Sequence, residues 1–108
     1  RRFIAEGMPA TAIFATSDEI TIGLIEGLRA EGVAVPGDVS IVGFDDVAPF
    51  HLFATPVTAI RQSVRAMGRR ALALLLETNW QDLTSPARQE LLPVELVVRE
   101  SVAPPAKR

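Results

Sequence analysis

The sequence predicts an α/β fold built on a parallel βαβ sheet. Residues 11–15 and 39–44 are short apolar runs without polar alternation, which is typical of strands covered on both faces. Between these runs, residues 18–31 repeat apolar side chains at helical spacing. A strand, a helix and a second strand joined by short links form a right-handed unit in which the two strands run parallel.

Composition excludes several other classes of protein. The chain has 108 residues, 48% of them hydrophobic, and a net charge of −2, as expected for one ordinary soluble domain. It contains no cysteine, which excludes disulfides, thiolate metal sites and cysteine nucleophiles, and its single His51 excludes a multi-histidine site. No apolar run approaches the roughly 18 residues that cross a bilayer. The slightly acidic charge argues against direct contact of this segment with DNA.

Turn and cap residues mark the first elements. Gly7 and Pro9 end a short helix, so the chain is expected to begin inside an element, as a fragment of a longer protein does. The second helix has Asp18 as its favoured cap and ends before Gly32. Ile22 lies outside the predicted buried stripe of this helix. That stripe consists of Ile20, Leu24, Ile25 and Leu28.

The second half of the chain continues the alternation of strands and helices. A third strand covers residues 57–61, and Ser63 can cap a helix that reaches Glu77. The polar loop after this helix contains Trp80, which is expected to pack on the helix. A last strand covers residues 92–98. The predicted buried face of the helix comprises Val64, Met67, Ala71, Leu74 and Leu75.

Polar side chains follow both strands of the βαβ unit. Ser17 and Asp18 come after the first strand, and Asp45 and Asp46 come after the second. Because parallel strands end at the same edge of a sheet, these residues are expected to converge where open α/β sheets bind ligands. An ionised carboxylate at this edge can accept hydrogen bonds from neighbouring hydroxyl groups of a sugar.

Five segments carry a recognisable pattern along nearly the whole chain. They include Ile41-Val42-Gly43-Phe44-Asp45-Asp46 and Ala59-Ile60-Arg61-Gln62, and in full they are residues 9–19, 35–46, 56–62, 68–71 and 92–101. In these segments the chain closely resembles the LacI/GalR family of bacterial transcription repressors. Members of that family have an N-terminal helix-turn-helix, a hinge helix and a core with two α/β subdomains around an effector cleft. The resemblance implies a C-terminal fragment of such a periplasmic-binding-protein-like (type I) core.

The resemblance also implies how the chain divides. Residues 1–61 correspond to part of the C-terminal effector-binding subdomain. Residues 62–90 correspond to a crossover and one helix of the N-terminal subdomain with a loop, and residues 91–108 to the returning strand and the tail. The family's helix-turn-helix is absent from this sequence, so operator DNA is an expected partner of the parent protein only, through that module.

Three residues match family positions that face the effector, namely Asp45, Ser17 and Gln62. Each has a structural alternative. Asp45 can be a loop carboxylate satisfied by backbone N–H groups, Ser17 a helix cap, and Gln62 a solvated hinge residue. Asp46 is expected to order the loop. The implied ligand is a small molecule, a sugar or a derivative, and no cofactor, metal or catalytic residue is expected.

Ile22, Leu52 and Phe53 match family positions used for dimerisation through the C-terminal subdomain. An apolar residue outside the core stripe is also often a tolerated surface residue. The coincidence of three such positions favours a homodimer. His51, beside two of them, is expected to be a solvent-accessible loop residue.

The implied function is effector sensing and dimerisation in a cytoplasmic, DNA-binding repressor with no membrane contact. A periplasmic sugar-binding protein of a transport system shares this core and is the alternative. The ending Arg99-Glu100-Ser101 and the loop Gly43-Phe44-Asp45-Asp46 favour the repressor. An enzyme is a third class, because paired carboxylates bind Mg²⁺. The sequence shows no glycine-rich phosphate loop, no basic partner after a later strand and no nucleophile with a base, so catalysis is not expected.

Overall fold

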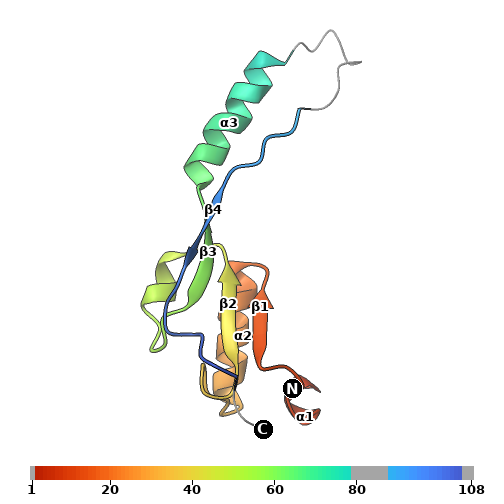
Figure 1. Ribbon diagram of the computed structural model, residues 1–108, viewed down its shortest axis with the longest axis vertical. Helices are drawn as coiled ribbons and strands as arrows, with labels where there is room; N and C mark the ends of the chain where they lie inside the picture. Colours follow the sequence, from red (N-terminus) through yellow and green to blue (C-terminus); the bar gives the residue numbers. More distant parts are fainter. Residues whose placement is uncertain (1, 79–87, 106–108) are drawn as a thin grey trace. The chain divides into compact units, whose positions relative to one another are not determined.

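The structure of the chain is a computed structural model that describes residues 2–78 and 88–105. Trp80 lies outside the described residues. Every predicted helix and strand is present, with bounds that differ by a few residues. In chain order the elements are α1 (Arg2–Ala5), β1 (Ala12–Ala15), α2 (Asp18–Ala30), β2 (Ser40–Phe44), the 3₁₀ helix η1 (Ala48–His51), β3 (Thr58–Gln62), α3 (Val64–Glu77) and β4 (Val94–Val97) (Figure 1).

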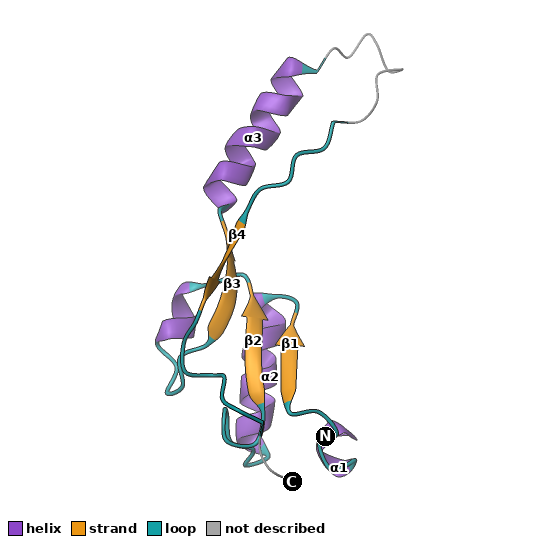
Figure 2. Cartoon of the chain, viewed as in Figure 1, coloured by secondary structure: helices purple, strands orange, loops and turns teal. Residues whose placement is uncertain are grey.

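The strands form one sheet in the order β1-β2-β3-β4 (Figure 2). Residues 12–15 of β1 pair in parallel with residues 40–43 of β2, and residues 42–44 of β2 pair in parallel with residues 58–60 of β3. α2 packs against β1 and β2 (Figure 1). The parallel βαβ unit predicted from the sequence is confirmed. β4 is shorter than the predicted strand and begins after Pro93, whose ring nitrogen has no hydrogen to donate to a neighbouring strand.

The buried stripe of α2 differs by one position from the sequence-based prediction. Ile20 is 55% exposed, whereas the next residue, Thr21, is fully buried. A buried hydroxyl needs a hydrogen-bond partner, and Thr21 Oγ1 donates to the carbonyl oxygen of Ser17 at 2.7 Å. Gly43 on β2 has no side chain, so Thr21 can pack directly against the strand. These two features explain why a threonine takes the buried position predicted for Ile20.

The hydrophobic core around the βαβ unit lies between α2 and the sheet. Leu24 and Ile25 complete the predicted stripe as partly buried side chains. Ile22, predicted outside the stripe, is also half-buried and packs against the core. Full burial of a large apolar side chain stabilises the fold by about 1.5 to 3 kcal/mol. The buried members of the core are Leu28, Val39, Ile41, Phe50, Val57 and Ala59.

The prediction of a strand buried on both faces is wrong for β1. Ala15 is buried and Ile13 packs against the core, but Phe14 is 52% exposed. The Phe14 ring meets that of Phe44 edge to face, with centroids 6.3 Å apart and an interplanar angle of 89°. Successive side chains of a strand point to opposite faces, and α2 covers the face that carries Ile13 and Ala15. An apolar run by itself does not reveal which of its two faces is covered.

The chain divides into two compact units, one of residues 1–61 with 95–108 and the other of residues 62–94. The first unit holds the core described above. The assignment of the units to the two subdomains of a periplasmic-binding-protein-like core remains a prediction. Within the described ranges, every helix is too short or too polar to traverse a bilayer.

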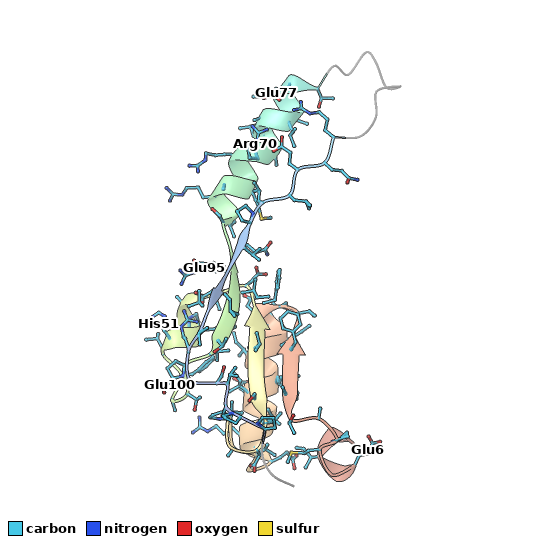
Figure 3. The ribbon with its side chains drawn as sticks, in the orientation of Figure 1. Glu6, His51, Arg70, Glu77, Glu95 and Glu100 are labelled. Carbon is cyan, nitrogen blue, oxygen red and sulfur yellow. The ribbon has the colours of Figure 1, made fainter. Side chains whose placement is uncertain are left out.

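The second unit contains α3 and the extended segment that follows the polar loop. Ser63 caps α3 as predicted, because its Oγ accepts from the backbone N–H of Ala66 at 3.4 Å. Arg70 on α3 (labelled in Figure 3) forms two hydrogen bonds with the Glu90 carboxylate, of which the one from Nε is 2.7 Å long. Of the five residues predicted for the buried face, Leu74 alone is half-buried. In the described part of this unit, an extended segment lies beside α3. Most of the surface of α3 is exposed.

Candidate functional site

Ser17 and Asp45 lie at matching positions beyond two neighbouring strand ends. Ala15 of β1 and Gly43 of β2 are partners in the parallel register. Ser17 and Asp45 each come two residues later, so both residues lie at the carboxyl edge of the sheet. The predicted convergence of polar residues at this edge is present in the structure.

Ser17, not Asp18, is the cap of α2. Its backbone is extended, with φ −153° and ψ 165°, and its Oγ accepts from the N–H of Ile20 at 3.2 Å. Asp18 is instead the first residue of the helix, where a negative charge interacts favourably with the helix dipole. The Ser17 hydroxyl that accepts this bond still has a hydrogen to donate. Capping and ligand contact are therefore compatible roles for the same side chain.

Asp45 has a left-handed backbone. Its φ is +67°, a conformation that costs residues other than glycine on the order of 1 kcal/mol. The residue is half-buried. Such a conformation persists where the surrounding structure enforces it, and strained residues of this kind cluster at functional sites. Nothing in the sequence pattern predicted this backbone conformation.

Asp46 accepts hydrogen bonds from two guanidinium groups. Arg99 donates from Nη1 to Oδ1 at 2.7 Å and from Nη2 to Oδ2 at 2.9 Å. Arg61 donates to Oδ2 from Nε at 3.0 Å and from Nη2 at 2.6 Å. Hydrogen bonding from Arg99 lowers the pKa of the Asp46 carboxyl below 3.8, burial opposes this shift, and hydrogen bonding from Arg61 adds to it.

These contacts correct one sequence-based expectation. The sequence analysis found no basic partner after a later strand. Asp46 has two such partners, one within a later strand and one after a later strand, which the linear pattern did not reveal. Arg61 lies in β3, and Arg99 lies two residues beyond β4. The carboxylate of Asp46 is only 5% exposed and is held by these partners, in agreement with its expected role in ordering the loop. The two arginines are the partners of Asp46 that sequence reasoning missed.

Gln62 belongs to the other unit. It is the last residue of β3 and the first residue of the second unit. Val64, the first residue of α3, is 71% exposed. The structure thus brings Ser17 and Asp45 to one edge of the first unit, whereas the position of Gln62 at that edge remains a prediction.

The three residues predicted for dimerisation differ in exposure. Leu52 is 75% exposed. Ile22 and Phe53 are half-buried and pack against the core, and the Phe53 ring lies 6.2 Å from that of Phe50. His51 is exposed at the end of η1, as predicted (Figure 3). Leu52 is therefore the member of this group with the most free apolar surface.

Residues 1–102 match the family model of the periplasmic binding protein-like domain. The chain belongs to this family. This periplasmic binding protein-like chain is 43% identical over 94 residues to the HTH-type transcriptional repressor PurR of Actinobacillus pleuropneumoniae serotype 3, an alignment that covers 85% of the chain and 28% of the repressor. The chain thus spans less than a third of the length of that repressor.

Solved structures show the same relationship. A LacI family transcriptional regulator from Enterococcus faecalis with bound ribose is 36% identical, with a TM-score of 0.77 over 98% of the chain and 40% of the regulator. The lac repressor dimer bound to operator and an anti-inducer is 29% identical, with a TM-score of 0.77 over 93% of the chain and 30% of the repressor. The predicted resemblance of this periplasmic binding protein-like chain to LacI/GalR regulators, and the α/β fold class, are confirmed.

Proposed function

We propose that the chain is the effector-sensing part of a transcriptional regulator whose ligand is a small polyhydroxylated molecule, a sugar or a derivative. The observation that carries the proposal is the placement of Ser17 and Asp45 two residues beyond register partners at the carboxyl edge of the sheet. The similar proteins are repressors and regulators, and one of them has bound ribose. The parent protein would act in the cytoplasm and reach operator DNA through a separate N-terminal helix-turn-helix.

Each proposed contact has a distinct chemical role. The Asp45 carboxylate accepts from two neighbouring hydroxyl groups of the ligand, and the Ser17 hydroxyl donates to a ligand oxygen. Gln62 is proposed as an effector contact through its side-chain amide, and residues 62–90 as part of the N-terminal subdomain. The role is binding rather than catalysis. Asp46 supports this distinction, because its carboxylate is already held by Arg61 and Arg99 instead of pairing with Asp45 around a metal ion.

Calorimetry on the full-length protein tests the ligand proposal. D-ribose is the first probe, followed by D-galactose and D-glucose. Asp45→Ala should weaken binding of the accepted sugar by about 1.5 to 3 kcal/mol, because a hydrogen bond to a charged group is lost. Saturable binding of a sugar with unchanged affinity in Asp45→Ala would remove Asp45 from the site. Absence of binding by all three sugars would overturn the proposed ligand class.

Ser17 needs a control for its second role as a cap. Ser17→Ala removes both the cap of α2 and the proposed ligand contact, whereas Ser63→Ala removes a cap of the same kind from α3. Both variants should lose about 1 kcal/mol of stability. Ser17→Ala should also weaken sugar binding several-fold, and Ser63→Ala should not. Equal affinities of the two variants would leave Ser17 as a cap alone.

We also propose that the protein forms a homodimer through a surface that includes Ile22, Leu52 and Phe53. One of the similar solved structures is a dimer. Leu52→Asp is the sharpest test, because this side chain is 75% exposed and its replacement leaves the core intact. Leu91→Asp, at a fully exposed position, is the matched control. Sedimentation should show a weakened dimer for Leu52→Asp alone, and a dimer as strong as the wild type would contradict the interface.

A further inference from the structure

The Asp46 carboxylate is fixed by partners that are themselves anchored. Arg99 is 16% exposed, and its Nη1 also donates to the carbonyl oxygen of Val57 at 2.6 Å. The backbone N–H of Arg99 donates to Thr58 Oγ1 at 2.9 Å. Arg99 is therefore held against the start of β3 by both its side chain and its backbone. Asp46 cannot turn without breaking its two hydrogen bonds with this anchored guanidinium group.

The second partner, Arg61, completes a cluster of balanced charge. Its Nη1 lies 3.5 Å from Oε2 of Glu95, which lies on β4 (Figure 3). Two arginines and two carboxylates make the cluster neutral overall. The cluster is neutral, and its one buried carboxylate, that of Asp46, already accepts hydrogen bonds from both arginines. It therefore attracts a charged ligand only weakly. Its effect on binding must therefore come through geometry.

The geometry that Asp46 would hold is the backbone conformation of its neighbour, Asp45. Asp45 has a φ of +67°, a left-handed conformation that costs residues other than glycine on the order of 1 kcal/mol, so it persists where the surrounding structure supports it. On one side it is joined to Phe44, whose register partner is Ile60 of β3. On the other side it is joined to Asp46, whose side chain is tied to Arg61 of β3 and to Arg99. The left-handed backbone is thus restrained from both sides.

We propose that Asp46 is a positioning residue for ligand binding, which acts through its ion pairs with Arg99 and Arg61 by holding the Asp45 backbone in its left-handed conformation. This inference rests on the proposed function of Asp45 as a ligand contact. A gain in stability alone is a weaker explanation, because replacing a whole buried ion pair by apolar residues of similar size is often neutral or stabilising, although removing one partner is costly. Accurate placement of an adjacent binding group is a role that an apolar pair could not fill.

A double-mutant cycle on the full-length protein tests the inference, with D-ribose as the titrated ligand. Asp46→Asn keeps the size of the side chain and removes its charge, and it should weaken ribose binding at least tenfold. In an Asp45→Ala background the same substitution should change the affinity less than twofold, because the group that it positions is gone. Glu26→Gln, at an exposed position of α2, is the control and should bind as the wild type does.

A structural role and a positioning role give different results in this cycle. Mere destabilisation would lower the unfolding temperature of Asp46→Asn and leave the affinity of the folded fraction unchanged. An affinity within twofold of the wild type, or an equal loss with and without Asp45, would overturn the inference. Tenfold weaker binding that disappears in the Asp45→Ala background supports it.

Hydrogen exchange separates failure of this inference from failure of the proposed function. If the wild type does not bind D-ribose, the proposed ligand is wrong for this sugar. The positioning role is then tested by hydrogen exchange in the ligand-free protein. Amides of residues 43–48 should then exchange at least tenfold faster in Asp46→Asn and at the wild-type rate in Glu26→Gln. Unchanged exchange in Asp46→Asn would overturn the positioning role.

Discussion

Ser101 and Ile41 are joined by two hydrogen bonds although 60 positions separate them in the sequence. The Ser101 hydroxyl donates to the carbonyl oxygen of Ile41 at 2.6 Å, and the backbone N–H of Ile41 donates to the carbonyl oxygen of Ser101 at 2.9 Å. The same hydroxyl accepts from the N–H of Thr58 at 2.8 Å. One fully buried serine thus connects the C-terminal segment to both β2 and β3.

Ser101→Ala should lower the free energy of unfolding by about 2 kcal/mol, because it leaves buried backbone groups of Ile41 and Thr58 without this partner. Urea denaturation of the full-length protein measures the change. Thr16→Ala, at an exposed position, should stay within about 0.5 kcal/mol of the wild type. Equal stabilities of the two variants would show that the buried bonds contribute nothing.

Gly43→Ala and Gly23→Ala should have opposite effects on stability. A Cβ on Gly43 would lie 2.9 Å from Cε2 of Phe50 and 3.0 Å from Oγ1 of Thr21, so overpacking should cost about 1 to 3 kcal/mol. Gly23 on α2 has open space around it, and alanine there should stabilise the helix by about 0.5 to 1 kcal/mol. Thermal unfolding of the two variants measures both changes in stability. A Gly43→Ala protein as stable as the wild type would contradict the expected loss.

Asp45→Gly and Asp45→Ala should bind ligand equally poorly but differ in stability. Both variants lack the carboxylate. Glycine adopts a φ of +67° without strain, whereas alanine is strained in this conformation. The glycine variant should therefore be more stable by about 1 kcal/mol. Denaturation of the ligand-free proteins measures this difference. If the alanine variant is the more stable, the left-handed conformation is not enforced in solution.

The contribution of Asp46 to stability should disappear in acid. Hydrogen bonding from Arg99 holds the pKa of this carboxyl below its ordinary value of 3.8 in the folded protein. The stabilisation is therefore complete above the unfolded pKa and is lost as the pH falls through the lower, folded pKa. Asp46→Asn should cost about 2 kcal/mol at pH 7, and the difference from the wild type should shrink as the pH falls below 3.8. A difference that grows in acid would contradict the assigned sign.

Local patterns in the sequence determined the order and type of the elements. Helical spacing, glycines beyond helix ends and uninterrupted apolar runs act over a few residues, so they predicted α2, α3 and the strands with small errors at their ends. The parallel topology followed from the short links of the βαβ unit. Because parallel strands end at one edge, the same pattern also predicted that Ser17 and Asp45 lie together.

Contacts between distant positions were decided by the tertiary structure alone. Thr21 replaced Ile20 in the core because Gly43, on another element, leaves room for it. Arg61 and Arg99 became partners of Asp46 although they lie 15 and 53 positions further along the chain. Periodicity carries no information about such pairs, because their proximity depends on how the strands are arranged in the sheet. The backbone conformation of Asp45 is likewise imposed by its surroundings, since an aspartate by itself prefers a negative φ.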